Sequence, residues 1–261
     1  MRSKMTTFQH NGVNLYYEDT GDGQPILMLH GLTSNHESFR PEIEALKKDY
    51  RVIAPDARGH GASDRMPHFT LDDHIEDILA LIDHLQLPSI RLLGVSMGSY
   101  IAQGVAVQIP ERVKKLVLVV TKSHGSESSL VQLLDRHAEE MKGLSLPEKL
   151  IHASRYMYYN ETAVNNRLHE TAKHSRQLTV DEQKIASQAL MGFDFRKELH
   201  RITAETLVIS GTHDGLNPPA YGQETAELIP NATYMEFKLS GHAPNVEQPC
   251  LFMEIIEDFL K

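Results

Sequence analysis

The feature of this sequence that most constrains its fold is a series of short, nearly continuous apolar runs. Strands buried on one face alternate apolar and polar residues, whereas strands buried on both faces of a parallel sheet form continuous apolar segments. Most of the runs end in glycine, histidine, serine or aspartate. The runs occupy residues 25–29, 50–54, 90–95, 113–120, 206–210 and 233–239.

Helical patterns lie between these runs. Apolar residues recur every three or four positions over residues 75–85 and again over 252–260, which predicts helices with one apolar face. Residues 8–18 carry Asn11-Gly12 between extended segments, which indicates a hairpin. Strands that alternate with helices predict a doubly wound α/β sheet, whose functional residues gather at the carboxyl ends of the strands.

One segment departs from this alternation. Residues 122–195 contain no evident strand and are rich in methionine, tyrosine and histidine, with helix-compatible stretches at 131–142 and 180–191. We interpret this segment as a helical insertion. The core domain then consists of residues 1–121 and 196–261.

Composition narrows the classes of partner. The chain carries 26 basic and 35 acidic residues, a net charge of −9, which argues against nucleic acid or an anionic membrane as a main partner. Cys250 is the single cysteine, so neither an internal disulfide nor a thiolate metal site is expected, and we expect it to pack at the start of the last helix. The start of the chain has no apolar signal-peptide region, and no apolar run approaches 18 residues, so we expect a cytoplasmic protein.

A candidate nucleophile lies at the end of the 90–95 run. The segment Gly94-Val95-Ser96-Met97-Gly98 is a G-x-S-x-G motif between a predicted strand and a predicted helix, the context of a nucleophile elbow. A sharp turn there lifts Ser96 above the sheet and needs small neighbours, which Gly94 and Gly98 provide. The alternative is a glycine-rich turn with an incidental serine.

A serine nucleophile needs a base and an orienting acid. Among fifteen histidines, His242 is singled out because it follows the last strand run. Asp214 follows the 206–210 run, and the order Ser96, Asp214, His242 is that of α/β hydrolases. Asp214 could instead be an ordinary Asp-Gly turn residue, and His242 a loop histidine. The other position for the acid, after the 113–120 run, reads Thr-Lys-Ser and holds no carboxylate.

An acyl-transfer site also needs hydrogen-bond donors for a developing oxyanion. The backbone N–H of Met97 is one candidate because it follows the nucleophile. Leu32, in the His30-Gly31-Leu32 loop after the first parallel strand, is the other.

These motifs together resemble those of the α/β-hydrolase superfamily, in particular its compact esterases, lactonases, perhydrolases and carbon–carbon hydrolases. The resemblance implies an eight-stranded, mostly parallel sheet with an inserted helical cap, a Ser-His-Asp triad and no cofactor. It also implies a structural role for residues 56–63, so neither Arg58 nor His60 is expected to be catalytic. The matching motifs lie at residues 30–31, 56–63, 94–98, 211–214 and 241–242.

Departures from the family patterns narrow the range of activities to expect. Dehalogenases and epoxide hydrolases of this fold carry aspartate at the elbow, where this chain has Ser96. Perhydrolases usually carry tryptophan beside the site, and this chain has none. The lipase-type His-Gly-Gly-Gly loop is absent. No dinucleotide or Walker motif occurs, and the His68–His74 region has no metal-ligand spacing, so neither a cofactor nor a metal is expected.

Three functional hypotheses follow. The leading one is a cofactor-free serine hydrolase acting on a small-molecule acyl substrate, which is an ester, lactone or thioester. The second is a carbon–carbon hydrolase or lyase of the menaquinone-pathway type, with an acidic substrate held by Arg136, Arg155 or Arg167. The third is a hydrolase-like ligand sensor. Nothing in the sequence specifies an oligomeric state. Apolar side chains of the insertion are candidates for a pocket wall or for its own packing: Tyr156, Met157, Tyr158, Tyr159, Met191, Phe193 and Phe195.

Overall fold

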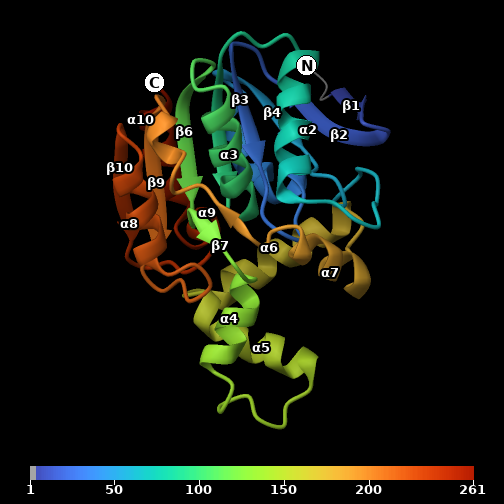
Figure 1. Cartoon of the computed structure of the whole chain (residues 1–261), viewed down its shortest axis with the longest axis vertical. Coiled ribbons are helices and arrows are strands. Elements are labelled where there is room, and N and C mark those ends of the chain that lie inside the picture. Colours follow the sequence, from blue (N-terminus) through green and yellow to red (C-terminus); the bar gives the residue numbers. More distant parts are fainter. Residues whose placement is uncertain (1–3) are drawn as a thin grey trace.

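The computed structural model describes residues 4–261 and contains an eight-stranded sheet with helices on both faces (Figure 1). The strand order is β1-β2-β4-β3-β5-β6-β9-β10, and all neighbours from β4 to β10 are parallel. This confirms the predicted mostly parallel, doubly wound sheet. The strands are β1 (Lys4–His10), β2 (Val13–Thr20), β3 (Gln24–Leu29), β4 (Tyr50–Pro55), β5 (Ile90–Val95), β6 (Val113–Val119), β9 (Glu205–Gly211) and β10 (Ala232–Phe237).

The antiparallel edge of the sheet is the predicted hairpin. β1 and β2 pair antiparallel and are joined by a two-residue turn at Asn11 and Gly12. The φ angles of these residues, 48° and 77°, are those of a hairpin turn whose twist matches that of the two strands. β2 then pairs antiparallel with β4, which joins the hairpin to the parallel strands.

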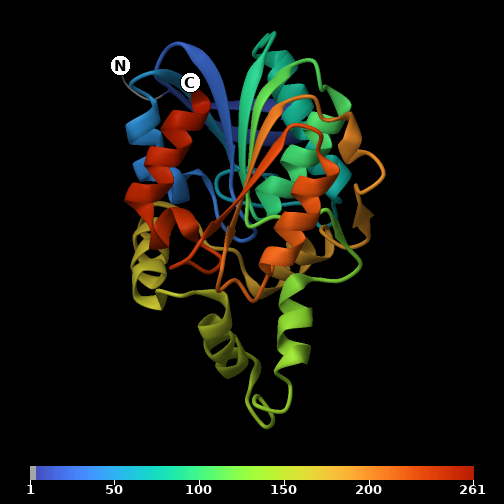
Figure 2. The same ribbon diagram turned by 90° about the vertical axis from the view of Figure 1, so that its left-hand side faces the viewer.

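Helices cover the two faces of the sheet, as Figure 2 shows with the sheet nearly edge-on, and they bury an apolar core on each face. One face carries α2 (Leu71–His84), α3 (Met97–Gln108) and α8 (Pro219–Leu228), and the other carries α1 (Arg40–Leu46) and α10 (Pro249–Leu260). The residue before α2 is Thr70, and its side chain and that of Asp73 cap each other's backbone N–H groups. Its apolar face, predicted from the 75–85 pattern, packs on α3 and the sheet.

The helical insertion, residues 122–195, lies between β6 and β9. It contains α4 (Ser129–Arg136), α5 (Leu146–Met157), α6 (Glu161–His174) and α7 (Val180–Gln188). The prediction that it holds no strand is wrong: β7 (His124–Gly125) and β8 (Phe193–Asp194) pair antiparallel and close its neck (Figure 1). Strands of two residues leave no periodic pattern in a sequence. The helices are also shorter than the predicted 131–142 and 180–191, since α4 ends at Arg136 and α7 at Gln188.

The insertion occupies the end of the sheet where the parallel strands finish, while the C-terminus lies at the opposite end (Figure 1). The remaining short helices are η1 (His36–Phe39), η2 (Leu199–Arg201) and α9 (Pro244–Glu247). Cys250 lies near the start of the last helix, α10, but it is exposed, so the prediction that it is a packing residue is wrong. Within residues 4–261 no helix combines the length and the apolar character needed to cross a membrane.

Candidate active site

Ser96 lies in a strained turn between β5 and α3. Its φ of 52° and ψ of −117° are unusual for a residue with a side chain and mark a site that the surrounding structure must hold in place. The two motif glycines permit the close packing around it. A Cβ at Gly94 would lie 2.2 Å from the Gly98 carbonyl oxygen, and one at Gly98 would lie 2.0 Å from that of Leu29. A larger residue at either position therefore collides with backbone.

The structure brings the three predicted side chains together from separate loops. The Nε2 atom of His242 lies 2.9 Å from the Ser96 Oγ, and its Nδ1 lies 2.7 Å from the Asp214 Oδ2. Asp214 is 3% exposed, and its other oxygen, Oδ1, accepts hydrogen bonds from the backbone N–H groups of Leu216 and Asn217 at 2.8 and 2.9 Å. A carboxylate fixed in this way can orient the imidazole and stabilise its protonated form.

Two backbone donors border the serine. Met97 is the first residue of α3, and neither its N–H nor that of Leu32 donates to a protein acceptor within residues 4–261. Leu32 lines the same cavity as Ser96, and a Cβ at Gly31 would lie 3.6 Å from the Ser96 Cβ, at ordinary contact distance. Free N–H groups beside a nucleophile are available to a negatively charged oxygen.

His30 fixes the loop that carries one of these donors. The Ala57 N–H donates to its Nε2 at 3.0 Å, so this nitrogen is unprotonated and Nδ1 donates to the Gly31 carbonyl at 2.8 Å. Burial lowers the pKa of His30, which agrees with a neutral ring. The histidine of the His30-Gly31 pair thus has a positioning role that its sequence context alone did not indicate.

The end of α5 contacts both loops that carry His242 and Asp214. The carbonyl of Met157 accepts from the His242 N–H at 2.6 Å, and that of Tyr156 accepts from the Gly215 N–H at 2.7 Å. The carboxylate of Glu247 accepts from the N–H groups of Tyr159 at 2.6 Å and of Gly241 at 2.8 Å. The insertion therefore helps to hold the loops that carry His242 and Asp214 in place. The contacts of the Tyr156 and Met157 carbonyls could not be predicted from the sequence, because every residue has a backbone carbonyl.

Ser96 and His242 open into a cavity of about 380 Å³ between the core and the insertion. That volume is ample for a small organic substrate. Of the seven side chains considered for a pocket wall, only Met157 and Tyr158 line the cavity. Its other insertion residues include Leu130, Leu150, Val164, Leu168 and Leu190.

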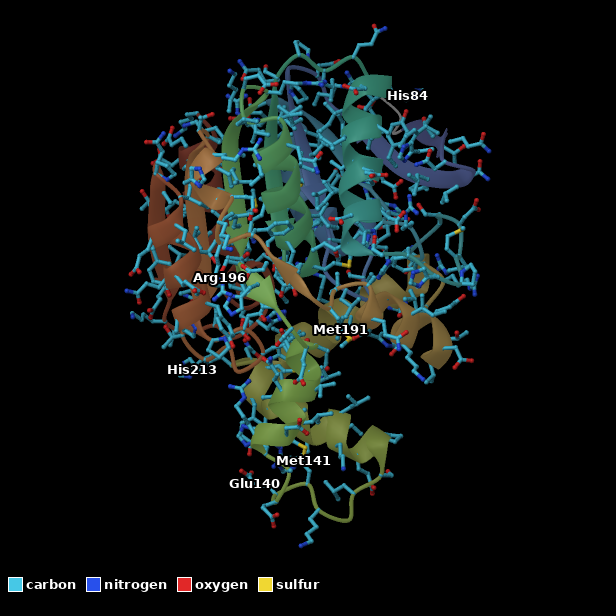
Figure 3. All side chains as sticks on the ribbon, viewed as in Figure 1. His84, Glu140, Met141, Met191, Arg196 and His213 are labelled. Carbon is cyan, nitrogen blue, oxygen red and sulfur yellow. The ribbon has the colours of Figure 1, made fainter. Side chains whose placement is uncertain are left out.

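The remaining wall candidates have other surroundings. Phe193 stacks on Tyr100 and contacts Phe195, so both phenylalanines belong to the core packing at the neck. Tyr159 and Met191 are about half exposed. Figure 3 shows Met191 near the junction of core and insertion, and Met141 at the outer end of the insertion.

The three candidate arginines also differ in place. Arg167 lines the cavity, where it donates to the Ser38 carbonyl at 2.8 Å and lies 3.6 Å from the Glu42 carboxylate. Arg136 donates to the Gly215 carbonyl, and Arg155 is exposed. Only one of the three is therefore placed to meet a substrate, and its guanidinium already has a carboxylate partner.

Lys122 is a lining residue that sequence reasoning passed over. It is 3% exposed, and burial lowers its pKa to about 8. Its Nζ lies over the rings of Tyr100 and Phe193, 5.8 and 5.9 Å from their centroids. A polar residue after a strand was visible in the sequence, but its burial depends on the neck of the insertion.

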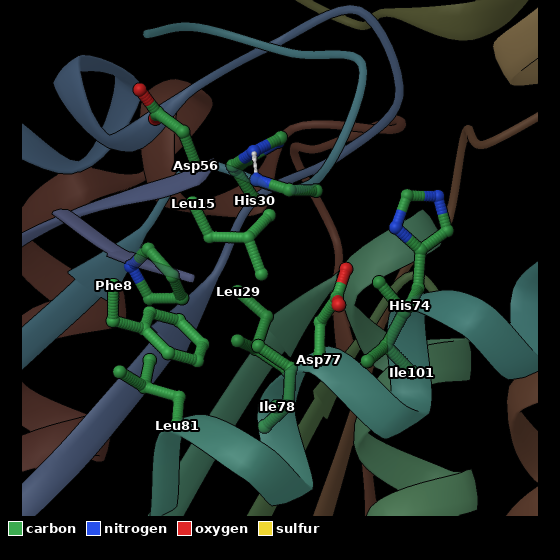
Figure 4. A pocket seen from close by; sticks show the side chains of 12 residues that line it. Phe8, Leu15, Leu29, His30, Asp56, His74, Asp77, Ile78, Leu81 and Ile101 are labelled. Carbon is green, nitrogen blue, oxygen red and sulfur yellow. Dashed lines mark hydrogen bonds between the residues drawn. The ribbon is translucent and has the colours of Figure 1, made fainter. Parts of the chain in front are cut away.

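A second, much smaller cavity lies beside His30 on the α2 side of the sheet (Figure 4). Its volume of about 20 Å³ suits little more than one water molecule, and mainly apolar residues such as Leu15, Leu29 and Ile78 line it. The neighbouring His74 is fully buried with neither ring nitrogen hydrogen-bonded to the protein, and burial lowers its pKa well below the usual value. This cavity is too small for an organic substrate.

The loop at residues 56–63 acts structurally, as the resemblance implied. Arg58 forms a buried bidentate ion pair with Asp77, at 2.6 Å from each oxygen. Asp56 accepts hydrogen bonds from the backbone N–H groups of His36 and Ala62, both at 2.8 Å. Within residues 4–261 no three acidic, histidine or cysteine side chains are grouped so that they could hold a metal ion.

Comparisons with known proteins agree with this fold. A sequence model of the alpha/beta hydrolase fold matches residues 24–249. The chain is 30% identical over 259 residues to 3-oxoadipate enol-lactonase 2 of Acinetobacter baylyi, covering 98% of this chain and 96% of that protein.

Two solved structures extend the comparison. An enol-lactonase from Burkholderia xenovorans has a TM-score of 0.81 at 26% identity, covering 98% of this chain and 99% of that one. A thermophilic esterase from Thermogutta terrifontis has a TM-score of 0.78 at 28% identity, covering 100% and 98%.

Proposed function

Because the chain belongs to the alpha/beta hydrolase fold family, we propose that it is a serine hydrolase that cleaves a small ester or lactone. The observation that carries the proposal is the hydrogen-bonded series from Ser96 Oγ through His242 to Asp214, at 2.9 and 2.7 Å. The similarity to an enol-lactonase and an esterase supports these substrate classes.

The proposed mechanism has two steps. In the first, His242 takes the proton of Ser96 as the serine oxygen attacks the substrate carbonyl, and the N–H groups of Leu32 and Met97 stabilise the oxyanion. Collapse of the tetrahedral intermediate transfers the proton from His242 to the leaving alcohol or enol and leaves an acyl-enzyme. In the second, His242 deprotonates a water that attacks the acyl-enzyme, and Ser96 regains its proton as the acid is released.

The insertion serves as a cap in this proposal. It supplies about half of the apolar residues that line the cavity, so a bound substrate is shielded from water. Shielding lowers the local dielectric constant, which strengthens the interaction between the two backbone donors and the oxyanion.

The test combines kinetics with labelling of the nucleophile. Wild-type protein should show a burst of nitrophenol from a 4-nitrophenyl ester, and a fluorophosphonate should label Ser96, identified by mass spectrometry. Ser96→Ala should lose on the order of 10⁶ in turnover and take up no label. Ser126→Ala, at an exposed serine of the insertion, is the matched control and should keep both activities. Turnover by folded Ser96→Ala at the wild-type rate would refute the serine mechanism. If the serine mechanism holds, a panel of esters, lactones and thioesters identifies the substrate class.

A further inference from the structure

The cavity that holds Ser96 contains a lysine without an anionic partner. Lys122 follows β6, one strand away from the serine, and lines the same cavity. Within residues 4–261 no carboxylate oxygen lies within 4.0 Å of its Nζ, and no side-chain or backbone acceptor hydrogen-bonds to it. Lysines are almost never buried without such a partner, because an ammonium loses its hydration on burial.

The surroundings of Lys122 hold its backbone in place and leave room for its ammonium. The Gln103 Nε2 donates to the Lys122 carbonyl at 3.0 Å, and the Phe195 N–H donates to the Ser123 carbonyl at 2.9 Å. A Cβ at Gly125 would lie 2.8 Å from the Lys122 Nζ, so the glycine provides the space that the ammonium occupies. The rings of Tyr100 and Phe193 stabilise a cation weakly but cannot neutralise it.

The nearby carboxylates have other roles or partners. Asp214 holds His242, and Glu224 lies near Ser123 and His124. Glu127 lines the cavity at its exposed side and forms no ion pair with the lysine. Arg167, the other cation of the lining, has Glu42 beside it. Lys122 is therefore the positive charge of this cavity that lacks an anion.

We propose that Lys122 recognises a carboxylate on the substrate, so that the protein acts on anionic esters or lactones, such as half-esters or lactones of dicarboxylic acids. This inference rests on the proposed function and specifies its substrate class. A carboxylate bound there would gain an ion pair shielded from water and would restore a partner to the ammonium. Since burial lowers the pKa of Lys122 only to about 8, the side chain remains mainly protonated at pH 7 and can bind an anion.

The test compares two matched series of 4-nitrophenyl esters. One series carries the half-esters of pentanedioic, hexanedioic and heptanedioic acids, and the other carries the neutral pentanoate, hexanoate and heptanoate esters. We expect wild-type protein to prefer the anionic series after subtraction of spontaneous hydrolysis. In Lys122→Met the ratio of kcat/KM for anionic over neutral esters should fall about tenfold or more, mainly through KM. Lys142→Met, at a lysine whose side chain is 80% exposed, should keep the wild-type ratio.

The other outcomes separate this inference from the proposed function. An unchanged ratio in Lys122→Met, or a fall in Arg167→Met instead, overturns the role of Lys122 while the hydrolase stands. If neither series is turned over, the proposed function fails, and calorimetry with hexanedioate decides about the lysine. Binding that is lost in Lys122→Met but kept in Lys142→Met supports the anion site. Equal binding by all three proteins, or no binding by wild type, overturns it.

Discussion

The buried ammonium of Lys122 should cost the folded protein stability. Methionine has an unbranched side chain of similar length without the charge, and it adapts well to irregular apolar surroundings. We therefore expect Lys122→Met to unfold at higher denaturant concentration than wild type at pH 7. The substitution should stabilise the fold while it weakens the proposed recognition of anionic substrates.

The size of the effect follows from the pKa of Lys122. A pKa lowered by burial from 10.5 to about 8 corresponds to about 3 kcal/mol less stability for the charged form. Because the folded-state pKa lies below the unfolded value, the penalty is fully present below about pH 8 and disappears as the pH rises above 10.5. The free energy of unfolding of Lys122→Met should thus exceed that of wild type by about 3 kcal/mol at pH 7, and by about 1 kcal/mol at pH 10.

Urea unfolding of both proteins at pH 7 and pH 10 measures these differences. Taking the difference between variants at each pH removes the contribution of the other titrating groups. Lys142→Met, which removes an exposed ammonium, should show a difference near zero at both values. The reasoning is refuted if Lys122→Met is no more stable than wild type at pH 7, or if its advantage is the same at pH 10.

Three further predictions concern the site and the insertion. Asp214→Asn should keep the fold, measured by circular dichroism, and lose about 10⁴ in turnover because the amide favours the wrong tautomer of His242; near-normal kcat would assign the acid elsewhere. Gly98→Ala should be destabilised by about 1–3 kcal/mol in urea unfolding, because its Cβ would lie 2.0 Å from the Leu29 carbonyl oxygen, and wild-type stability would contradict the packing argument. In hydrogen exchange, the amides of residues 129–150 should exchange faster than those of the core and should slow down after phosphonate labelling. The amide of Tyr159 should stay protected by its hydrogen bond to Glu247, and that of Gly215 by its hydrogen bond to the Tyr156 carbonyl. Exchange as slow as the core in 129–150, unchanged by the label, would make this part of the insertion a fixed wall.

The core of the fold was predictable because its strands are buried on both faces. Each of the six nearly continuous apolar runs became a parallel strand, and the hairpin at Asn11-Gly12 formed as its turn residues indicate. The insertion was less predictable, since α4 and α7 end at Arg136 and Gln188, well inside the helix-compatible stretches 131–142 and 180–191. The two-residue strands β7 and β8 are held by pairing with each other, a tertiary relation that neither segment encodes alone.

The candidate catalytic residues were identifiable because each follows a strand in a recognisable motif. Parallel strands deliver their carboxyl ends to one edge of the sheet, so motif order was enough to bring Ser96, Asp214 and His242 together. The contacts from the carbonyls of Tyr156 and Met157 were not identifiable. They depend on where α5 ends relative to the core, and carbonyl groups carry no sequence signal.

Lys122 shows how a residue can be visible in the sequence while its chemistry is not. Its position after β6 was considered only as a place for a carboxylate, and a lysine there suggests an ordinary solvated side chain. The structure differs from that expectation because Phe193 of β8 pairs with Gly125 of β7 and places its ring against the Lys122 ammonium. That pairing brings an aromatic ring and a glycine against the ammonium and removes it from water. The β7–β8 pair, which the sequence did not predict, is therefore the element that buries the Lys122 ammonium beside the cavity of Ser96.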